Sequence, residues 1–388
     1  NTNKKIADLS KKFGLEVDPT AKIENLNVSM QQRVEILKML YREAEILIFD
    51  EPTAVLTPQE IEFLLEIIRE MRRNGKTIIL ITHKLEEIKQ VADRCAIMNR
   101  GKLIEICDVA ETSTKKMAEL MVGREVSFAP EKTPFTPGEV MLNVEHLTVK
   151  NQDGFPVVND VSFSVRGGEI FAIAGVAGNG QVEIADAIAG LVPATGGKVQ
   201  LGGMDITNAT VKARNKQGLA YIPEDRQTWG LILDFTLSEN LLMRRYDQEP
   251  YCVKGVLHRD KFDEKSRVLI EEYDIRSGQA EATIVRSMSG GNQQKAIIAR
   301  EIDLDTPFII FVQPTRGLDI GAIENIHQQI LAERDKGKAI LLISLELDEI
   351  MNLADTIGVI YNGQLLKIAP ADTLTSNEVG QFMMGVKE

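Results

Sequence analysis

The sequence predicts an α/β protein with parallel sheets, made of two tandem copies of one domain. Short apolar runs alternate with amphipathic helical segments, which is the pattern of a doubly wound parallel sheet. Landmark residues also recur 262 positions apart, as Asp93 and Asp355 or Gly101 and Gly363 do. An ungapped repeat over about 75 residues indicates a duplicated domain rather than chance.

The first copy, residues 1–123, is predicted element by element. Strong helix formers with apolar residues near helical spacing predict a helix over 31–41. The apolar run 46–49 predicts a buried parallel strand, and a second strand is expected over 76–83. Between them, the amphipathic segment 58–75 predicts a helix that stops at an Asn-Gly pair. No glycine-rich loop precedes these elements, so we expect this domain to lack its first half through truncation.

A linker and a complete second copy follow. Three prolines and the lack of periodicity predict a linker over 124–138. The second copy, residues 139–388, begins with the alternating segments 140–149 and 157–165, which predict antiparallel strands. Residues 167–191 then have the pattern of a strand, a glycine-rich loop and a helix. A helical insert, the remaining sheet strands and closing helices complete the domain.

Composition excludes several classes of protein. The net charge of −12 argues against a nucleic-acid partner, because such proteins normally carry a basic face. No apolar run is long enough to span a bilayer, so any membrane function requires partner subunits. The three thiols, Cys95, Cys107 and Cys252, fit no disulfide or zinc spacing. We expect each to be a small buried hydrophobe in a reducing compartment.

Several motifs carry a family resemblance. The run SGGNQQK contains Ser289, apolar strands end in DEPT at Asp50 and in QPT at Gln313, and a further strand ends in His83. Over essentially the whole chain, this combination resembles the ATP-binding cassette, the motor subunit of ABC transporters. The runs AVLTPQE and PTRGLD resemble the double-cassette ATPases of simple-sugar and nucleoside importers. The loop GNGQ together with QPTRGLD and SLELDE is most similar to the nucleoside branch.

The resemblance implies a fold, cofactors and partners. Each cassette would combine a parallel core sheet, an antiparallel β subdomain and a helical subdomain. ATP and Mg²⁺ would be the cofactors. The subunit would lie at the cytoplasmic face of the membrane, with two integral-membrane permeases and, indirectly, an extracellular substrate-binding lipoprotein. Nucleosides are the favoured cargo and simple sugars the alternative.

Functions of other classes fit the sequence less well. A soluble double-cassette translation factor would carry two intact ATP sites and a long charged linker. A DNA-repair or chromosome-structural ATPase would need a zinc module or a long coiled coil. The remaining alternative is that these residues alone form an inert fragment of an ATPase.

The first copy keeps the residues that phosphoryl transfer requires. Asp50 ends an apolar strand, where it is placed to hold Mg²⁺ through water. Glu51 is placed to polarise the attacking water, and His83 to steady that water and the γ-phosphate. Phosphoryl transfer depends on positioning and charge neutralisation more than on covalent chemistry, so these residues decide whether a cassette hydrolyses ATP.

The second copy has the phosphate loop but lacks the residues that ATP hydrolysis requires. Glycines allow backbone N–H groups to point at phosphates, and the helix start adds positive potential. The expected nucleotide-binding residues are Gly175, Val176, Ala177, Gly178, Asn179, Gly180, Gln181 and Val182. Gln181 stands where a lysine contacts the β- and γ-phosphates, and Val182 where a hydroxyl binds Mg²⁺. Val312, Gln313 and Leu345 replace the Asp, Glu and His of the first copy, so we expect binding without hydrolysis.

The signature segments divide in the same way. The second copy keeps a complete signature at a helix start, consisting of Ser289, Gly290, Gly291, Asn292 and Gln293. In the first copy, Asn27-Val28-Ser29 has lost both the serine and the two glycines of the signature. Cassettes of this family pair head to tail, so each ATP lies between one loop and the other cassette's signature. The losses, including Thr57 in place of Asp319, would then fall in one composite site, which leaves one hydrolytic and one structural site.

Three further residues are weaker candidates. Glu224 occupies a position where many cassettes carry a glutamine that faces the membrane subunit, and a glutamate there is usual for the sugar-type branch. Trp229, the only tryptophan, is expected to be a partly buried hydrophobe of the insert, or else a contact with a permease helix. Phe155 is a candidate for stacking on adenine.

Overall fold

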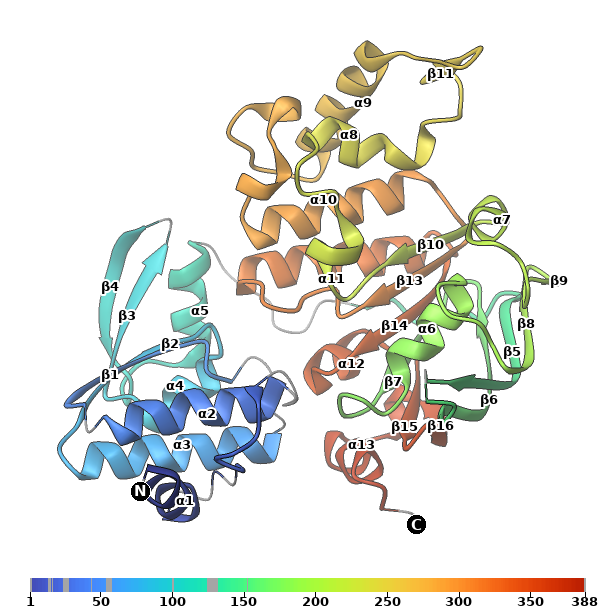
Figure 1. Ribbon diagram of the computed structural model, residues 1–388. Helices are drawn as coiled ribbons and strands as arrows, with labels where there is room; N and C mark the ends of the chain where they lie inside the picture. The colour runs from blue at the N-terminus through green and yellow to red at the C-terminus, as the bar shows by residue number, and fades with distance from the viewer. Residues whose placement is uncertain are drawn as a thin grey trace. The chain divides into compact units, whose positions relative to one another are not determined.

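The chain forms two compact units, residues Asn1–Val126 and Ser127–Glu388, which we call unit 1 and unit 2 (Figure 1). The computed structural model describes residues 2–12, 15, 17–23, 28–42, 44–53, 58–99, 101–123, 132–151 and 153–386. Within these residues, no helix is both long and apolar enough to cross a membrane.

Unit 1 pairs helices with two small sheets. Its helices are α1 (Thr2–Lys12), α2 (Val28–Tyr41), α3 (Pro58–Arg73), α4 (Leu85–Val91) and α5 (Thr114–Val122). Its strands are β1 (Ile46–Asp50), β2 (Thr77–Ile81), β3 (Arg94–Asn99) and β4 (Lys102–Asp108). Strands β1 and β2 are parallel, and β3 and β4 form an antiparallel hairpin. The inner face of β1, with Leu47 and Phe49, packs in one core with Leu64 and Ile68 of α3.

Unit 2 is built on a mixed sheet and an antiparallel sheet. Its strands are β5 (Val140–Lys150), β6 (Pro156–Arg166), β7 (Ile170–Ala174), β8 (Gly196–Leu201), β9 (Met204–Asp205), β10 (Leu219–Ile222), β11 (Cys252–Val253), β12 (Val256–Leu257), β13 (Phe308–Val312), β14 (Ala339–Ser344), β15 (Thr356–Tyr361) and β16 (Gln364–Pro370). The main sheet has the order β10-β13-β14-β7-β15-β16 and is parallel except for β16. The antiparallel sheet has the order β6-β5-β8-β9.

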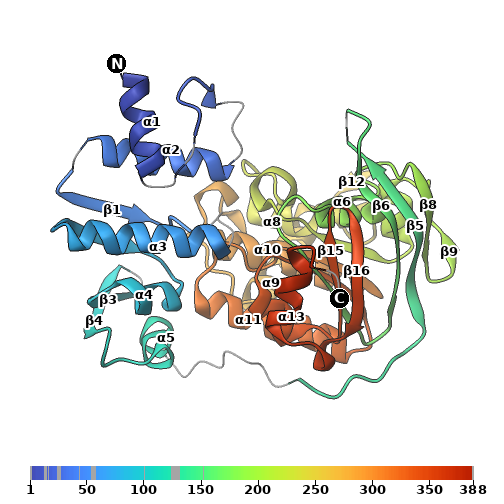
Figure 2. The same cartoon turned by 90° about the horizontal axis from the view of Figure 1, so that it is seen from below.

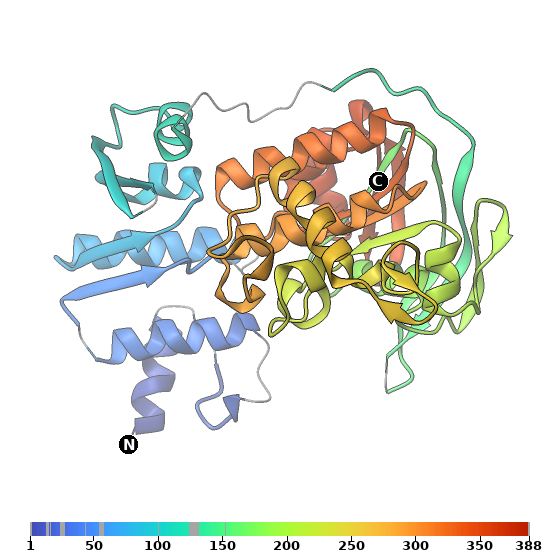
Figure 3. The same cartoon turned by 90° about the horizontal axis from the view of Figure 1, so that it is seen from above.

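Helices cover both faces of the main sheet of unit 2. The helices of unit 2 are α6 (Gln181–Ala189), α7 (Val211–Lys216), α8 (Leu237–Leu242), α9 (Arg259–Glu272), α10 (Gly290–Asp303), α11 (Ile320–Asp335), α12 (Leu347–Leu353) and α13 (Ser376–Met383). One core lies between the sheet and helices α10, α11, α12 and α13, and the other contains α6 and the antiparallel sheet. Figure 2 shows α13 beside β15 and β16, and Figure 3 shows α10 and α11 lying side by side. The predicted helical insert contains α8, α9 and a small hairpin, β11–β12.

The internal repeat is present in three dimensions. From α2 to α5, each element of unit 1 has a counterpart that begins 262 residues later in unit 2, as α3 and α11 do. Individual contacts recur as well. Arg72 pairs with Asp93 at 2.5 Å, and the equivalent guanidinium of Arg334 lies 2.9 Å from the carboxylate of Asp355. The two copies therefore share a backbone framework, and differences between them lie in their side chains.

One face of unit 1 differs from its counterpart in exposure. Ile46, Ile48, Ile79 and Ile81 point from one side of β1 and β2, and their exposed fractions are 63%, 59%, 48% and 49%. We call these four residues the isoleucine face. Their counterparts in unit 2 are fully buried in the core that also contains α6, namely Phe308, Ile310, Leu341 and Ile343. Unit 1 thus exposes a surface that the same framework buries in unit 2.

The end of the predicted linker is attached to unit 2. The guanidinium of Arg334 donates a hydrogen bond of 2.9 Å to the carbonyl oxygen of Thr133. The ammonium of Lys132 lies 3.2 Å from the carboxylate of Asp355. The beginning of the predicted linker, residues 124–131, lies outside the described residues.

Candidate nucleotide sites

The Asp-Glu-His set of unit 1 lies at the carboxyl edge of its parallel strands. The backbone N–H of Glu51 donates a 2.9 Å hydrogen bond to the carbonyl of Ile81, so the chain remains paired one residue beyond β1. Glu51 adopts a left-handed backbone with φ 47°, which turns its side chain out of the strand direction. The ring Nδ1 of His83 lies 2.9 Å from Oε1 of Glu51. The structure therefore brings Glu51 and His83 together beside Asp50, although 32 residues separate them in sequence.

The same edge in unit 2 keeps the geometry and lacks the charges. The N–H of Gln313 donates to the carbonyl of Ile343 at 2.8 Å, and Gln313 has φ 52°. Its amide oxygen accepts a 3.3 Å hydrogen bond from the N–H of Leu345, the counterpart of His83. Val312, the counterpart of Asp50, is fully buried. None of these three side chains carries the carboxylate or imidazole found at the equivalent position of unit 1.

The glycine-rich loop of unit 2 has the backbone of a phosphate loop. It connects β7, which is buried along its whole length, to the start of α6. Gly180 precedes the helix with φ 103°, and a Cβ there would lie 2.3 Å from the carbonyl oxygen of Val157. The loop is fixed to the β15–β16 turn, since Asn179 accepts hydrogen bonds from the N–H groups of Asn362 and Gly363 at 2.7 and 3.0 Å. Only glycine fits at position 180, and the loop is held rigidly from outside.

The two substituted residues of this loop point into the protein. The Gln181 side chain is 2% exposed, and its Nε2 donates a 3.0 Å hydrogen bond to the carbonyl of Val176 in the same loop. Its Oε1 is buried and has no hydrogen-bond partner among the described residues. Val182 packs against the core that contains α6. Both side chains are therefore engaged inside the protein, Gln181 with its own loop and Val182 with the core.

The signature of unit 2 presents the start of a long helix. Ser289 precedes α10 with an extended backbone, and its hydroxyl does not cap the helix but accepts a 2.9 Å hydrogen bond from Nδ2 of Asn292. Ser289 is exposed, whereas Gln293 is buried and donates to the carbonyl of Val285 at 3.1 Å. A Cβ on Gly290 would lie 2.6 Å from the guanidinium of Arg226. A helix start of this kind has N–H groups and a hydroxyl that could bind an anion.

Comparison with known proteins decides the family. The family described as ABC transporter matches residues 1–54 and 158–316, which end shortly after DEPT in unit 1 and after QPT in unit 2. The chain belongs to the ABC transporter family. The match falls in two segments, which is consistent with the tandem cassettes that the sequence predicts.

Several relatives of the chain are import ATP-binding proteins. The nucleoside import ATP-binding protein NupA of Lactococcus lactis subsp. cremoris is 48% identical over 98% of this chain and 75% of its own length. The guanosine import ATP-binding protein NupO of Bacillus subtilis is also 48% identical, over 98% of this chain and 74% of its own. The ribose import ATP-binding protein RbsA of Hahella chejuensis is 34% identical over 97% and 74%. A nucleotide-free ABC cassette of known structure shares the fold, with a TM-score of 0.55 over 64% of this chain and all of its own, at 23% identity.

The first cassette has side chains suited to magnesium and water. Asp50 is exposed at the end of β1, and Glu51 has a buried oxygen, Oε2, without a hydrogen-bond partner among the described residues. Carboxylate and water oxygens are the ligands that Mg²⁺ prefers. These residues fit a hydrated Mg²⁺, which would neutralise phosphate charge, while Glu51 and His83 would orient the attacking water.

A buried glutamate of α4 contacts the segment that carries His83. Glu87 of α4 is 4% exposed, and burial raises the pKa of its carboxyl, an effect that the nearby charge of Glu51 reinforces. The hydroxyls of Thr53 and Thr82 and the charge of Lys84 oppose the rise. Because Thr82 precedes His83 directly, Glu87 contacts the segment that carries the histidine. This residue was not identified from sequence, where Glu87 belongs to an ordinary amphipathic helix.

The raised pKa of Glu87 predicts a pH effect on unit 1. Above the ordinary value of 4.5 and up to the folded-state pKa, the folded state binds more protons than the unfolded state. The free energy of unfolding of unit 1 therefore falls as the pH rises through this interval. Glu87→Gln is expected to weaken that pH dependence, measured by hydrogen exchange of α3 amides corrected for intrinsic rates. Glu349→Gln, the matched change in unit 2, should leave the pH dependence of unit 1 unchanged. The same pH dependence in the wild type and in Glu87→Gln would contradict the prediction.

Trp229 is not the partly buried residue that was favoured from sequence. Its side chain is 76% exposed, in a single π-helical turn, Arg226–Gly230. Asp225 caps this turn, because its carboxylate accepts hydrogen bonds from the N–H groups of Gln227 and Thr228. Nearby, Glu224 forms an ion pair with Arg316, which follows QPT directly. The turn is thus linked to the edge of the main sheet.

The remaining candidate residues lie in different environments, and some of them lie outside the described residues. Phe155 is 68% exposed in the turn between β5 and β6, two residues before Val157, which contacts the phosphate loop. Asp319 caps α11 by accepting a 2.9 Å hydrogen bond from the N–H of Ala322. Asn27, Thr57 and the side chains of Val28 and Ser29 lie outside the described residues.

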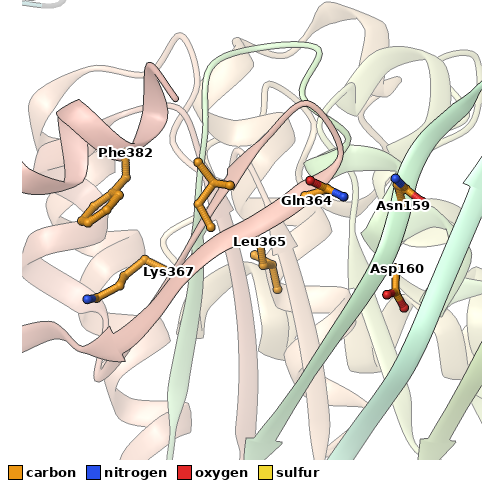
Figure 4. Close-up of a pocket in the computed structure, with 7 residues that line it drawn as sticks. Asn159, Asp160, Gln364, Leu365, Lys367 and Phe382 are labelled. Carbon is orange, nitrogen blue, oxygen red and sulfur yellow. The ribbon is translucent and has the colours of Figure 1, made fainter. Parts of the chain in front are cut away.

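A separate pocket of about 480 Å³ lies along β16 (Figure 4). Figure 4 shows Lys367 and Phe382 at one end and Asn159 and Asp160 at the other. The ammonium of Lys367 lies 5.6 Å from the ring centre of Phe382. None of the phosphate-loop or signature residues lines this pocket.

Proposed function

We propose that this chain is the ATP-hydrolysing subunit of an ABC importer whose cargo is a nucleoside. The assignment of a nucleoside as the cargo rests on the order of similarity among the relatives. The relatives named for nucleoside or guanosine import are 48% identical to the chain, whereas those named for glucose or ribose import are 38% and 34% identical. Simple sugars are the alternative cargo that these lower similarities favour.

The proposed mechanism uses one active and one inactive composite site. In a head-to-tail pair of cassettes, Asp50, Glu51 and His83 act with the signature of unit 2, which begins at Ser289. The hydrogen bond between Glu51 and His83 supports this assignment, because a carboxylate and an imidazole side by side are the groups that would orient an attacking water. The second composite site contains the loop Gly175–Val182 and binds nucleotide without hydrolysing it, because Val312 and Gln313 replace the metal-binding and water-orienting carboxylates.

The proposed partners are two integral-membrane permeases and, through them, an extracellular substrate-binding lipoprotein. The subunit would lie at the cytoplasmic face of the membrane and would not bind nucleic acid. The exposed indole of Trp229, in the turn after Glu224, supports a permease contact at this surface. ATP binding would close the cassettes and hydrolysis would reopen them, and this motion would drive alternating access in the permeases.

Uptake by intact cells tests the cargo. Deleting the gene for this subunit should abolish uptake of labelled guanosine and leave uptake of labelled ribose at its original rate. Re-expressing the wild-type gene should restore uptake, and a Glu51→Gln gene should not. Loss of ribose uptake with retention of guanosine uptake would support the sugar alternative instead.

The 388 residues alone are expected to hydrolyse ATP at a negligible rate. Their Asp-Glu-His set lies in unit 1, whereas their glycine-rich loop lies in unit 2 beside Val312 and Gln313. Phosphate release by the purified chain measures this. Steady turnover that Glu51→Gln abolishes would show that a complete site forms without any other polypeptide.

A further inference from the structure

Two of the three cysteines face each other across the β3–β4 hairpin. Cys95 on β3 is the register partner of Cys107 on β4, and both thiols are free. Sequence alone places 11 residues between them and shows no disulfide spacing. The pairing arises from an irregularity in the hairpin between Ile97 and Met98, which shifts the register of the strands. Without that shift, Cys95 would oppose a different residue.

The register of the hairpin gives Cys95 and Cys107 a backbone separation compatible with a disulfide. Directly opposed residues have Cα atoms about 4.5 or 5.5 Å apart and side chains on the same face. A disulfide requires a Cα separation of about 4.4–6.8 Å. Burial raises the pKa of the Cys95 thiol, and the charge of Cys107 raises it further, as expected for neighbouring sulfurs.

The two thiols differ in access to solvent. Cys107 is 6% exposed, on the face of the hairpin that also buries Ile97 and Val109. Cys95 is only partly buried. A small oxidant can therefore reach Cys95, and Cys107 is placed to react with the product. The equivalent hairpin of unit 2 carries Ile357 opposite Ala369, so the framework does not itself require a thiol at either position.

We propose that Cys95 and Cys107 form a site of reversible oxidation that closes as an intramolecular disulfide. The co-reactant is a low-molecular-weight disulfide. The thiolate of Cys95 attacks one sulfur of the reagent, forms a mixed disulfide and releases one thiolate, which takes up the proton lost by Cys95. The thiolate of Cys107 then attacks the Cys95 sulfur and releases the second reagent thiolate, which takes up the proton from Cys107. The protein loses two electrons and the reagent gains them.

The disulfide would link β3 to β4 close to the point where α4 is hydrogen-bonded to the end of the hairpin. The ammonium of Lys89 on α4 donates hydrogen bonds to the carbonyls of Val109 and Thr112, at 2.5 and 3.1 Å. Val109 lies two residues after Cys107. The bond is therefore expected to suppress local opening of β3 and β4 and to leave unit 2 unaffected.

Exposing the full chain to glutathione disulfide tests the proposal, and Cys252 serves as an internal control because its register partner is Leu257. The expected product has lost two hydrogen atoms, yields a peptide that joins Cys95 to Cys107, and keeps one titratable thiol. Dithiothreitol should reverse it. Hydrogen exchange should slow in β3 and β4 and stay constant in unit 2.

Variants separate the steps of the reaction. Cys107→Ala should stop at a stable glutathione adduct on Cys95, and Cys95→Ala should give little adduct at the buried Cys107. Cys252→Ala should leave the linkage intact. A persistent glutathione adduct on Cys95 of the wild-type chain, no reaction at Cys95, or linkage through Cys252 would each overturn the proposal.

Discussion

Glu51→Gln is expected to lower ATP hydrolysis by the assembled transporter by orders of magnitude while ATP binding is retained. The glutamine keeps the size and hydrogen-bonding reach of the glutamate but loses the negative charge that orients and polarises the attacking water. The change should be introduced in the chromosomal gene, so that the subunit is tested with its permeases. Phosphate release and nucleotide binding by the purified complex are the two measurements. His83→Ala should have a similar effect, because the imidazole holds the same carboxylate at 2.9 Å.

The chain provides its own matched control for this experiment. Gln313 has the same backbone conformation and the same pairing with the neighbouring strand as Glu51, 262 residues later. Gln313→Ala is therefore expected to change the hydrolysis rate little. If Gln313→Ala proves as damaging as Glu51→Gln, then the assignment of one active and one inactive site is wrong.

Repairing the phosphate loop of unit 2 is expected to tighten ATP binding without restoring hydrolysis. The double change Gln181→Lys and Val182→Thr returns the β- and γ-phosphate contact and the magnesium ligand. Each charge-assisted contact contributes about 1.5–3 kcal/mol at best. The gain must exceed a local loss, because Gln181 now donates a 3.0 Å hydrogen bond to Val176 and Val182 packs in the core. Hydrolysis stays absent because Val312, Gln313 and Leu345 are unchanged.

Calorimetric titration of the 388-residue chain measures this effect, since its glycine-rich loop lies in unit 2. The unmodified loop should bind ADP and ATP with similar, modest affinity and weak dependence on Mg²⁺, since backbone N–H groups supply most of its contacts. Gln181→Ala is the control that removes the side-chain hydrogen bond and adds no charge. If the unmodified chain binds no nucleotide at millimolar ATP, the loop is only a turn.

The parts that could be predicted from sequence are those with a strong local or repeated signal. The alternation of strands and helices identified the α/β fold, and the repeat aligned Glu51 with Gln313 and His83 with Leu345. The sequence placed Glu51 and His83 at the ends of two apolar strands, but the 2.9 Å contact between their side chains comes from the structure. These features depend on backbone topology, which periodicity and turn residues report directly.

The parts that could not be predicted depend on individual side chains and on register. Gln181 folds back because a carbonyl of its own loop lies within reach, and no residue pattern encodes that choice. Trp229 is exposed in a π-helical turn that Asp225 caps, whereas a lone tryptophan is ordinarily taken for a buried residue. Cys95 meets Cys107 only because of an irregularity in the hairpin.

The isoleucine face is expected to make unit 1 less stable to heat than unit 2. Full burial of one isoleucine side chain is worth about 1.5–3 kcal/mol, and a whole domain is stable by only about 5–15 kcal/mol. Four half-exposed isoleucines therefore withhold about 3–6 kcal/mol from unit 1, a large part of such a margin. The same surface lies on parallel strands, where apolar patches favour self-association. On heating, this chain should show two unfolding transitions, and unit 1 should unfold and aggregate while unit 2 is still folded.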